Sequence, residues 1–148
     1  AATYPAGQEP FGDRSLEMLR GLVERLGALG FAGVVHLEGH VGDFCEVEVA
    51  DGLFGLAPDG LPIERCARIG LPPGEAQAAS ARQSIAFANY LASRAADPRL
   101  RIEVLGLGAS RPVVPYPGVA FGLTAGEWNA VAKENNRIRI SLEAGHPP

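Results

Sequence analysis

Apolar residues near the start of the chain recur at helical spacing. Between Leu16 and Leu26 they return every three or four residues, which places them on one face of an α-helix. Asp13 or Ser15 can cap the first turn, and the glycines that follow Leu26 can end the last one. The pattern therefore predicts a helix over residues 14–28.

A second pattern, in which apolar and polar residues alternate, follows directly. Residues 33–40 are rich in β-branched side chains and are bounded by glycine, which is typical of a β-strand. Because side chains alternate between the two faces of a strand, Val35 and Leu37 are expected to point into the core. The polar residues of the segment then share the opposite face: His36, Glu38 and His40.

Two histidines and a glutamate so close together raise the question of a metal site. On a helix, His36 and His40 would share a face, but the glutamate comes one place later than in the zinc-protease motif. On a strand, the three residues form the polar face that a sheet covered by helices on one side requires. We therefore predict an exposed or half-exposed sheet face and no functional metal site.

Residues 41–74 form the least regular part of the chain. An alternating run from Cys45 to Val49 precedes the turn signal Asp51-Gly52, which predicts a β-hairpin. The stretch LPIERCARIGLPPG then carries three prolines and two glycines. A segment of this length between regular elements is typical of an insertion, either one with a function of its own or a flexible one.

The second half of the chain again shows clear periods. Strong helix formers predict a second long helix over residues 74–95. Alternating residues predict strands over 100–106 and 136–143, with a short helix beginning near Trp128 before the second of them.

Together these elements predict one α+β domain over residues 1–148. Its expected architecture is an α+β sandwich, with two long helices over a small sheet. Residues 1–12 are expected to be an irregular arm, and residues 41–74 an insertion after the first clear strand.

Composition supports a globular domain and narrows its partners. The chain has 148 residues, of which 47% are hydrophobic and 20% are charged, a balance typical of a folded domain with one core. The net charge of −4 and the lack of a basic patch argue against nucleic acid as a partner. No apolar run approaches the ~18 residues of a membrane span. The opening AATYPAGQEP is typical of a processed protein or an excised domain.

The sequence carries no motif for catalysis. It lacks a nucleophile elbow, a phosphate-binding loop and a zinc-protease motif. Gly106 and Gly108 are not followed by the third glycine of the dinucleotide-binding fingerprint, so they indicate a turn. We therefore expect a protein that is not an enzyme and that uses no cofactor.

Four stretches, taken in order, resemble the OmpA-like domain, the peptidoglycan-associating module of outer-membrane lipoproteins and flagellar stator proteins. The strand that ends in LEGH resembles the family's strand ending in a Gly-His-Thr-Asp turn. ASARQSIAFANYL resembles its helix that opens Leu-Ser-x-x-Arg-Ala. RIEVLGLGASRPV resembles its strand that leaves through Gly-x-Gly-x-x-x-Pro, and NNRIRISL resembles its closing Asn-Arg-Arg-Val strand.

The resemblance implies a small mixed sheet backed by two long helices. It also implies a non-catalytic periplasmic domain that holds the diaminopimelate part of the cell-wall stem peptide. In that family, the aspartate of the turn and the arginine of the helix hold this ligand. One carboxylate and one guanidinium suit a zwitterionic end, because each matches one of its two charges. Carried over, these roles fall to Asp43, which comes one residue late, and to Arg82, which is one step from the matching position Gln83.

The closing motif extends the implied binding site. Asn135 and Arg137 match it, whereas Asn136 stands where the family has its first arginine. The resemblance thus predicts a ligand-binding set of four residues: Asp43, Arg82, Asn135 and Arg137.

The two cysteines permit either one disulfide or two independent buried thiols. The periplasmic habit of the family favours a disulfide between Cys45 and Cys66, which would tie the two ends of the insertion. The broken ligand motifs and the long insertion also leave a second function open. In that alternative, the domain has lost the wall ligand and acts as a protein–protein scaffold in an envelope complex.

Overall fold

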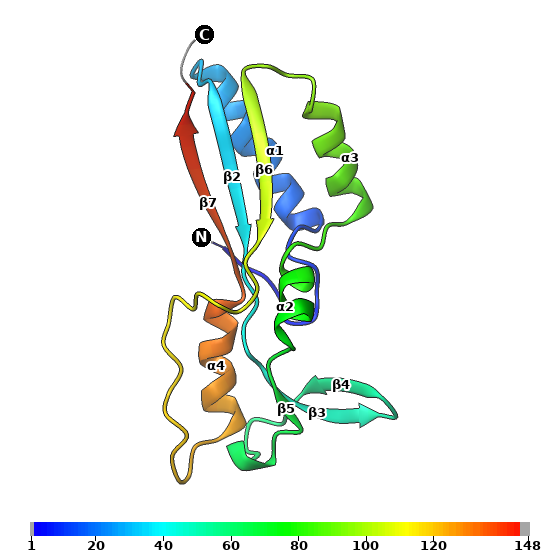
Figure 1. Cartoon of the computed structure of the whole chain (residues 1–148), viewed down its shortest axis with the longest axis vertical. Helices are drawn as coiled ribbons and strands as arrows, with labels where there is room; N and C mark the ends of the chain where they lie inside the picture. The colour runs from blue at the N-terminus through cyan, green and yellow to red at the C-terminus, as the bar shows by residue number, and fades with distance from the viewer. Residues whose placement is uncertain (1, 146–148) are drawn as a thin grey trace.

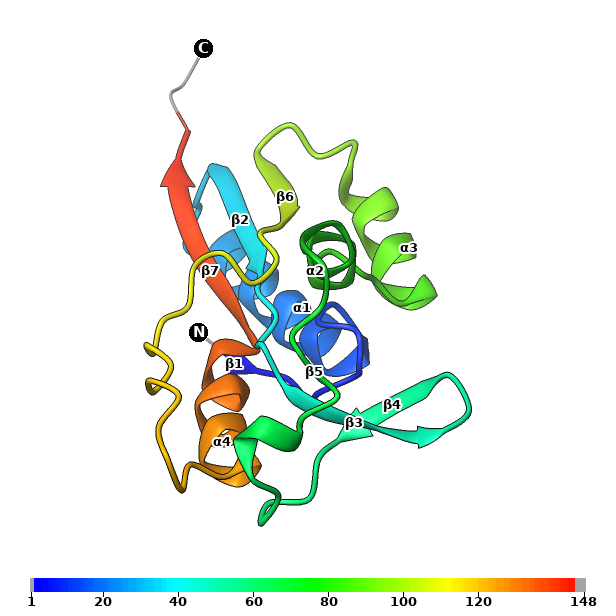
Figure 2. The same cartoon turned by 60° about the horizontal axis from the view of Figure 1, so that its bottom comes forward.

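The structure, a computed structural model that describes residues 2–145, has an α+β fold with two sheets arranged along the long axis of the molecule (Figure 1). The larger sheet lies at one end with α1 and α3, and the smaller sheet lies at the other end with α4 (Figures 1 and 2). The strands are β1 (Ala2–Thr3), β2 (Gly33–Gly39), β3 (Cys45–Ala50), β4 (Leu53–Leu56), β5 (Arg68–Ile69), β6 (Leu100–Gly106) and β7 (Arg137–Ala144). The helices are α1 (Asp13–Ala28), α2 (Pro73–Ser80), α3 (Ile85–Arg94) and α4 (Ala125–Asn135), with a short 3₁₀ helix η1 (Ile63–Arg65).

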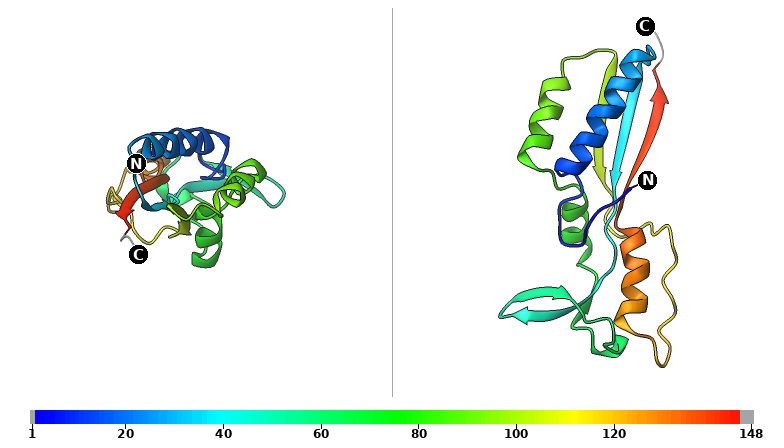
Figure 3. Two further views of the ribbon diagram at one scale, coloured as in Figure 1. Left: turned by 90° about the horizontal axis from the view of Figure 1, so that it is seen from above. Right: turned by 180° about the vertical axis from the view of Figure 1, so that it is seen from behind.

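The larger sheet is mixed and has the strand order β1-β7-β2-β6. β2 runs parallel to β6 and antiparallel to β7. Helices α1 and α3 pack against each other and lie on one side of this sheet, as the view from behind shows (Figure 3). The core between these layers is made of Phe11, Leu16, Leu19, Val23, Leu26, Val35, Leu37, Phe87, Leu100 and Ile138.

The smaller sheet has the order β4-β3-β5, and its β3–β4 hairpin projects from the body of the molecule (Figures 1 and 3). A disulfide between Cys45 and Cys66 joins the start of β3 to the residue after η1. A second apolar cluster surrounds this disulfide: Cys45, Ala57, Ile63, Ala125 and Trp128. The predicted hairpin and the predicted disulfide are therefore both confirmed.

Most of the predicted elements lie where the sequence places them. The first helix, the strands predicted over 33–40 and 100–106, and the closing strand all form within one or two residues of their predicted bounds. The short fourth helix begins at Ala125, before the predicted start at Trp128. Thr124 caps it, since its hydroxyl accepts from the backbone N–H of Glu127 and the Glu127 carboxylate accepts from Thr124 in return.

The predicted long helix over residues 74–95 is wrong, because the chain leaves the helix between α2 and α3. There the N-terminal arm pairs with it in a short parallel bridge between Phe11 and Gln83. The N–H of Phe11 donates to the carbonyl oxygen of Arg82, and the N–H of Ser84 donates to that of Phe11. Ser84 then caps α3 by accepting from the N–H of Phe87 at 3.1 Å. Pairing with a distant segment has overridden a strong local helix propensity.

Candidate functional site

β2 and β6 end side by side at a pair of glycines that allows α2 to approach the sheet. Gly39 and Gly106 are direct partners in the parallel register. A Cβ at Gly39 would overlap the carbonyl oxygen of Ser80, and one at Gly106 would press on the Ser80 hydroxyl and on Ala81. Glycine at both positions therefore lets the last turn of α2 rest directly on the strand ends.

Ser80 fixes the turn that follows β6. Its side chain is fully buried, and its hydroxyl donates to the carbonyl oxygen of Gln77 at 2.7 Å. The same hydroxyl accepts from the backbone N–H of Gly108 at 2.8 Å. Gly108 has a φ of 64°, in the left-handed region that favours glycine. The turn predicted from the glycines at 106 and 108 is therefore present and is bonded to α2 through Ser80.

Asp43 lies on the other side of this loop, and its backbone is held at both ends. The N–H of Asp43 donates to the hydroxyl of Tyr116 at 2.8 Å, and its carbonyl oxygen accepts from the indole N–H of Trp128 at 2.6 Å. The two aromatic rings stack with their centroids 4.6 Å apart. The carboxylate lies over the Cα of Gly70, where a Cβ would overlap one of its oxygens. The backbone of Asp43 is therefore held by two hydrogen bonds, and its side chain lies against Gly70.

The Asp43 carboxylate opens into a cavity of about 500 Å³, which we call the Asp43 cavity. No hydrogen bond or ion pair to this carboxylate forms within residues 2–145, and burial raises its pKa. The cavity is lined by Asp43, Leu71, Pro73, Ala76, Gln77, Gly106, Leu107, Gly108, Ala109 and Ser110. Asp43 is the one charged residue in this lining.

Arg82 lies elsewhere, in a separate cavity of about 420 Å³ between the N-terminal arm and the β3–β4 hairpin, which we call the hairpin cavity. This cavity also contains an ion pair in which the Arg68 guanidinium lies 3.0 Å from a carboxylate oxygen of Glu46. The same guanidinium lies 4.1 Å from the ring centre of Phe54. Asp43 and Arg82 therefore line different cavities, which adjoin at Leu71.

The other two predicted ligand residues line neither cavity. Asn135 is buried, and its side-chain oxygen accepts from the N–H groups of Val113 and Val114 while its amide donates to the carbonyl oxygen of Val114. Arg137, at the start of β7, exchanges backbone hydrogen bonds with His40. The structure thus gives Asn135 a role in holding the loop after β6.

Asn136 has a role that the sequence reasoning missed. It is buried, and its side-chain oxygen accepts from the N–H of Gly42 at 3.1 Å while its amide donates to the carbonyl oxygen of Tyr4 at 2.8 Å. It therefore joins the N-terminal arm to the segment that carries Asp43. In the sequence, the one sign of this role was that asparagine replaces the first arginine of the closing motif at this position.

The polar face predicted for the HLEGH segment is only partly correct. His36 lies on the uncovered face of the sheet, with Glu143 at 2.8 Å on β7 and Glu103 at 3.4 Å on β6. Glu38 is also partly exposed, but His40 is buried with 3% of its surface accessible, so that part of the prediction is wrong. β2 has ended at Gly39, and the segment after β6 crosses here, where the N–H of Val41 donates to Gly108 (Figure 1).

Burial leaves His40 in an unusual electrostatic setting. Its pKa is lowered first by desolvation and then by the positive charge of Arg137. Neither ring nitrogen has a hydrogen-bond partner, and the nearest Glu38 oxygen is 3.7 Å away. Within residues 2–145, no group of three or more histidine, cysteine, aspartate or glutamate side chains is arranged to hold a metal ion.

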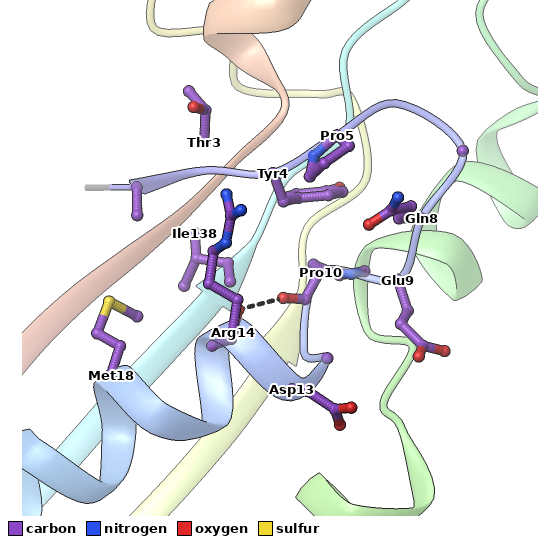
Figure 4. A pocket seen from close by; sticks show the side chains of 14 residues that line it. Thr3, Tyr4, Pro5, Gln8, Glu9, Pro10, Asp13, Arg14, Met18 and Ile138 are labelled. Carbon is purple, nitrogen blue, oxygen red and sulfur yellow. Dashed lines mark hydrogen bonds between the residues drawn. The ribbon is translucent and has the colours of Figure 1, made fainter.

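A further cavity, of about 640 Å³, lies under the N-terminal arm and beside the start of α1, and we call it the arm cavity (Figure 4). Met18 and Ile138 form part of its wall, and the charged side chains around it are Glu9, Asp13 and Arg14. The Ser15 hydroxyl donates to the carbonyl oxygen of Pro10 at 2.6 Å, which closes the arm onto the helix. None of the four predicted ligand residues lines this cavity.

Comparisons with known proteins leave the family unassigned. No family model matches the chain, and no curated protein matches it in sequence. Among the helices of residues 2–145, none combines the length and the apolar character needed to cross a membrane.

Proposed function

We propose that this chain is a non-catalytic binding domain of the bacterial envelope that holds the stem peptide of peptidoglycan. The proposal rests on the Asp43 carboxylate, which is half-buried, lies against Gly70 and forms no hydrogen bond or ion pair within residues 2–145, in a cavity at the ends of β2 and β6. A partly buried carboxylate without a partner favours a cationic ligand, because an incoming ammonium group supplies the missing opposite charge.

Three further observations support the proposal. Asp43 follows the LEGH strand and faces the turn after β6, so two of the four resembling stretches meet at one cavity. The mixed sheet carries helices α1 and α3 on one side, which agrees with the small mixed sheet backed by two helices that the OmpA-like resemblance implies. The disulfide agrees with the oxidising environment of the periplasm.

Co-sedimentation with purified sacculi tests this function. The wild-type domain should co-sediment, and Asp43→Asn should reduce the affinity by at least about tenfold, since it removes the charge that an ammonium group requires. Glu134→Gln is the matched control, because it removes one exposed carboxylate from α4 and should bind like the wild type. Arg82→Ala should cause a smaller loss, since Arg82 lies outside the Asp43 cavity. Equal binding by wild type and Asp43→Asn would contradict the proposal.

A second candidate function is a protein–protein scaffold in an envelope complex. It is favoured by the separation of Asp43 from Arg82 and by the apolar residues on the projecting hairpin. Val49 and Leu53 are 64% and 63% exposed, and such side chains on a projecting element are typical of a binding surface.

Site-specific photocrosslinking from position 53 in intact envelopes distinguishes the two functions. The scaffold function predicts discrete protein adducts that persist in Asp43→Asn, together with no co-sedimentation of the wild-type domain with sacculi. The peptidoglycan function predicts co-sedimentation that depends on Asp43 and is unaffected by Leu53→Ser.

A further inference from the structure

We infer that the Asp43 cavity takes a primary ammonium group on an aliphatic stem that carries no neighbouring carboxylate. This inference rests on the proposed function and narrows it. Within the wall, the preferred ligand would be a lysine-type side chain, or a diaminopimelate whose distal carboxyl group is amidated, rather than the free zwitterionic end.

The lining of the Asp43 cavity carries a single negative charge and no positive charge. Asp43 is the single ionisable side chain among the ten residues that line the cavity. A zwitterionic end would bring its own carboxylate close to that of Asp43 and leave it without a cation. Like charges held together in a partly desolvated site repel each other, so the zwitterion is selected against.

The nearby arginines lie outside the lining of the Asp43 cavity. Arg82 lines the hairpin cavity, on the other side of Leu71. Arg111 comes directly after Ser110 in the sequence but is not among the residues that line the Asp43 cavity, and its positive charge lowers the pKa of His40. The guanidinium that would receive a ligand carboxylate is therefore missing from the lining of the Asp43 cavity.

The remaining lining suits an aliphatic stem. Leu71, Pro73, Ala76 and Leu107 supply apolar walls, while Gln77 and Ser110 supply uncharged polar groups. A volume of about 500 Å³ is within the range of small-molecule sites. An aliphatic stem can pack on these apolar walls while its ammonium group pairs with the Asp43 carboxylate.

Three small probes test the inference by chemical-shift titration of the domain, with the Gly108 amide as reporter. The first is Nα-acetyl-lysine amide, which has the ammonium group and no carboxylate. The second is Nα-acetyl-diaminopimelate with its proximal carboxyl amidated, so that only the distal ammonium and carboxylate remain charged. The third is Nα-acetyl-norleucine amide, which has an aliphatic stem and no charge.

The lysine probe should bind at least about tenfold more tightly than the diaminopimelate probe, and the norleucine probe should cause no saturable shift. Asp43→Asn should abolish binding of the lysine probe, whereas Glu134→Gln should retain it. Equal or tighter binding of the diaminopimelate probe would overturn the inference, and so would a lysine probe that leaves Gly108 unperturbed.

Co-sedimentation with sacculi distinguishes a failure of the peptidoglycan function from a failure of the ligand preference. If sacculi bind through Asp43 while the diaminopimelate probe binds best, the proposed function stands and the ligand preference is wrong. If the lysine probe binds through Asp43 while sacculi do not co-sediment, the ligand preference stands and the peptidoglycan function is wrong.

Discussion

The buried hydroxyl of Ser80 offers a direct test of how the Asp43 cavity is held in shape. In Ser80→Ala, the methyl group keeps most of the packing at the last turn of α2, but the N–H of Gly108 loses its acceptor. A buried donor left without a partner costs about 1–3 kcal/mol. We therefore expect the free energy of unfolding to fall by about 2 kcal/mol, near the middle of that range.

Urea unfolding followed by circular dichroism measures this loss. The midpoint should fall while the dependence on urea concentration stays the same, because the surface exposed on unfolding is unchanged. Ser93→Ala is the matched control. Its hydroxyl also donates to a carbonyl oxygen three residues earlier, at 2.6 Å, but it is exposed. Removing it should change the stability by less than about 0.5 kcal/mol.

Amide hydrogen exchange provides a second measurement with a local readout. The Gly108 amide should be protected in the wild type and in Ser93→Ala, and should lose protection in Ser80→Ala. If Ser80→Ala matches the control in both stability and Gly108 protection, the hydroxyl does not fix this loop. The shape of the Asp43 cavity would then have to come from other contacts, and the role assigned to Ser80 would be refuted.

Three further predictions address the disulfide and the two perturbed ionisable groups. Replacing Cys45 and Cys66 together by alanine removes a crosslink across 21 positions and should lower the free energy of unfolding by about 3 kcal/mol, measured by urea unfolding against the unreduced wild type. Folding lowers the pKa of His40, so the unfolded chain takes up a proton first as the pH falls below 6.5. The free energy of unfolding should therefore drop with falling pH. The share of this drop that comes from His40 should be absent in His40→Asn. Folding raises the pKa of Asp43, so its ionised form lowers the free energy of unfolding at neutral pH. Thermal unfolding at pH 7 should therefore find Asp43→Asn at least as stable as the wild type. A clear loss of stability would show that the carboxylate is structural.

The order of elements could be predicted from the sequence because each depends on a local period. The heptad-like spacing of α1 and the alternation in β2 both report which face of the element is buried, and burial gives the same signal wherever the element lies in the fold. The hairpin was likewise predictable, since Asp51-Gly52 specifies the turn between two alternating runs. For the same reason, the capping box of Thr124 and Glu127 could have placed the start of α4 correctly.

The candidate site could not be predicted to the same degree, because it depends on contacts between distant segments. Nothing near Arg82 indicates that Phe11 pairs across the α2–α3 junction, and this pairing breaks the predicted long helix. Nor does the local sequence show that the backbone of Asp43 is bonded to Tyr116 and Trp128, or that Asp43 and Arg82 line different cavities. A motif gives the residue types of a site, but tertiary packing decides which cavity each one enters.

Trp128 is the sole tryptophan of the chain, and its indole donates to the carbonyl oxygen of Asp43 while stacking on Tyr116. The chain therefore contains an intrinsic fluorophore attached to the segment that presents the Asp43 carboxylate. Excitation of this ring gives an emission signal that comes from one place in the fold, with no dye or label to disturb the cavity. Titrations and stopped-flow experiments can use that signal to follow the site directly.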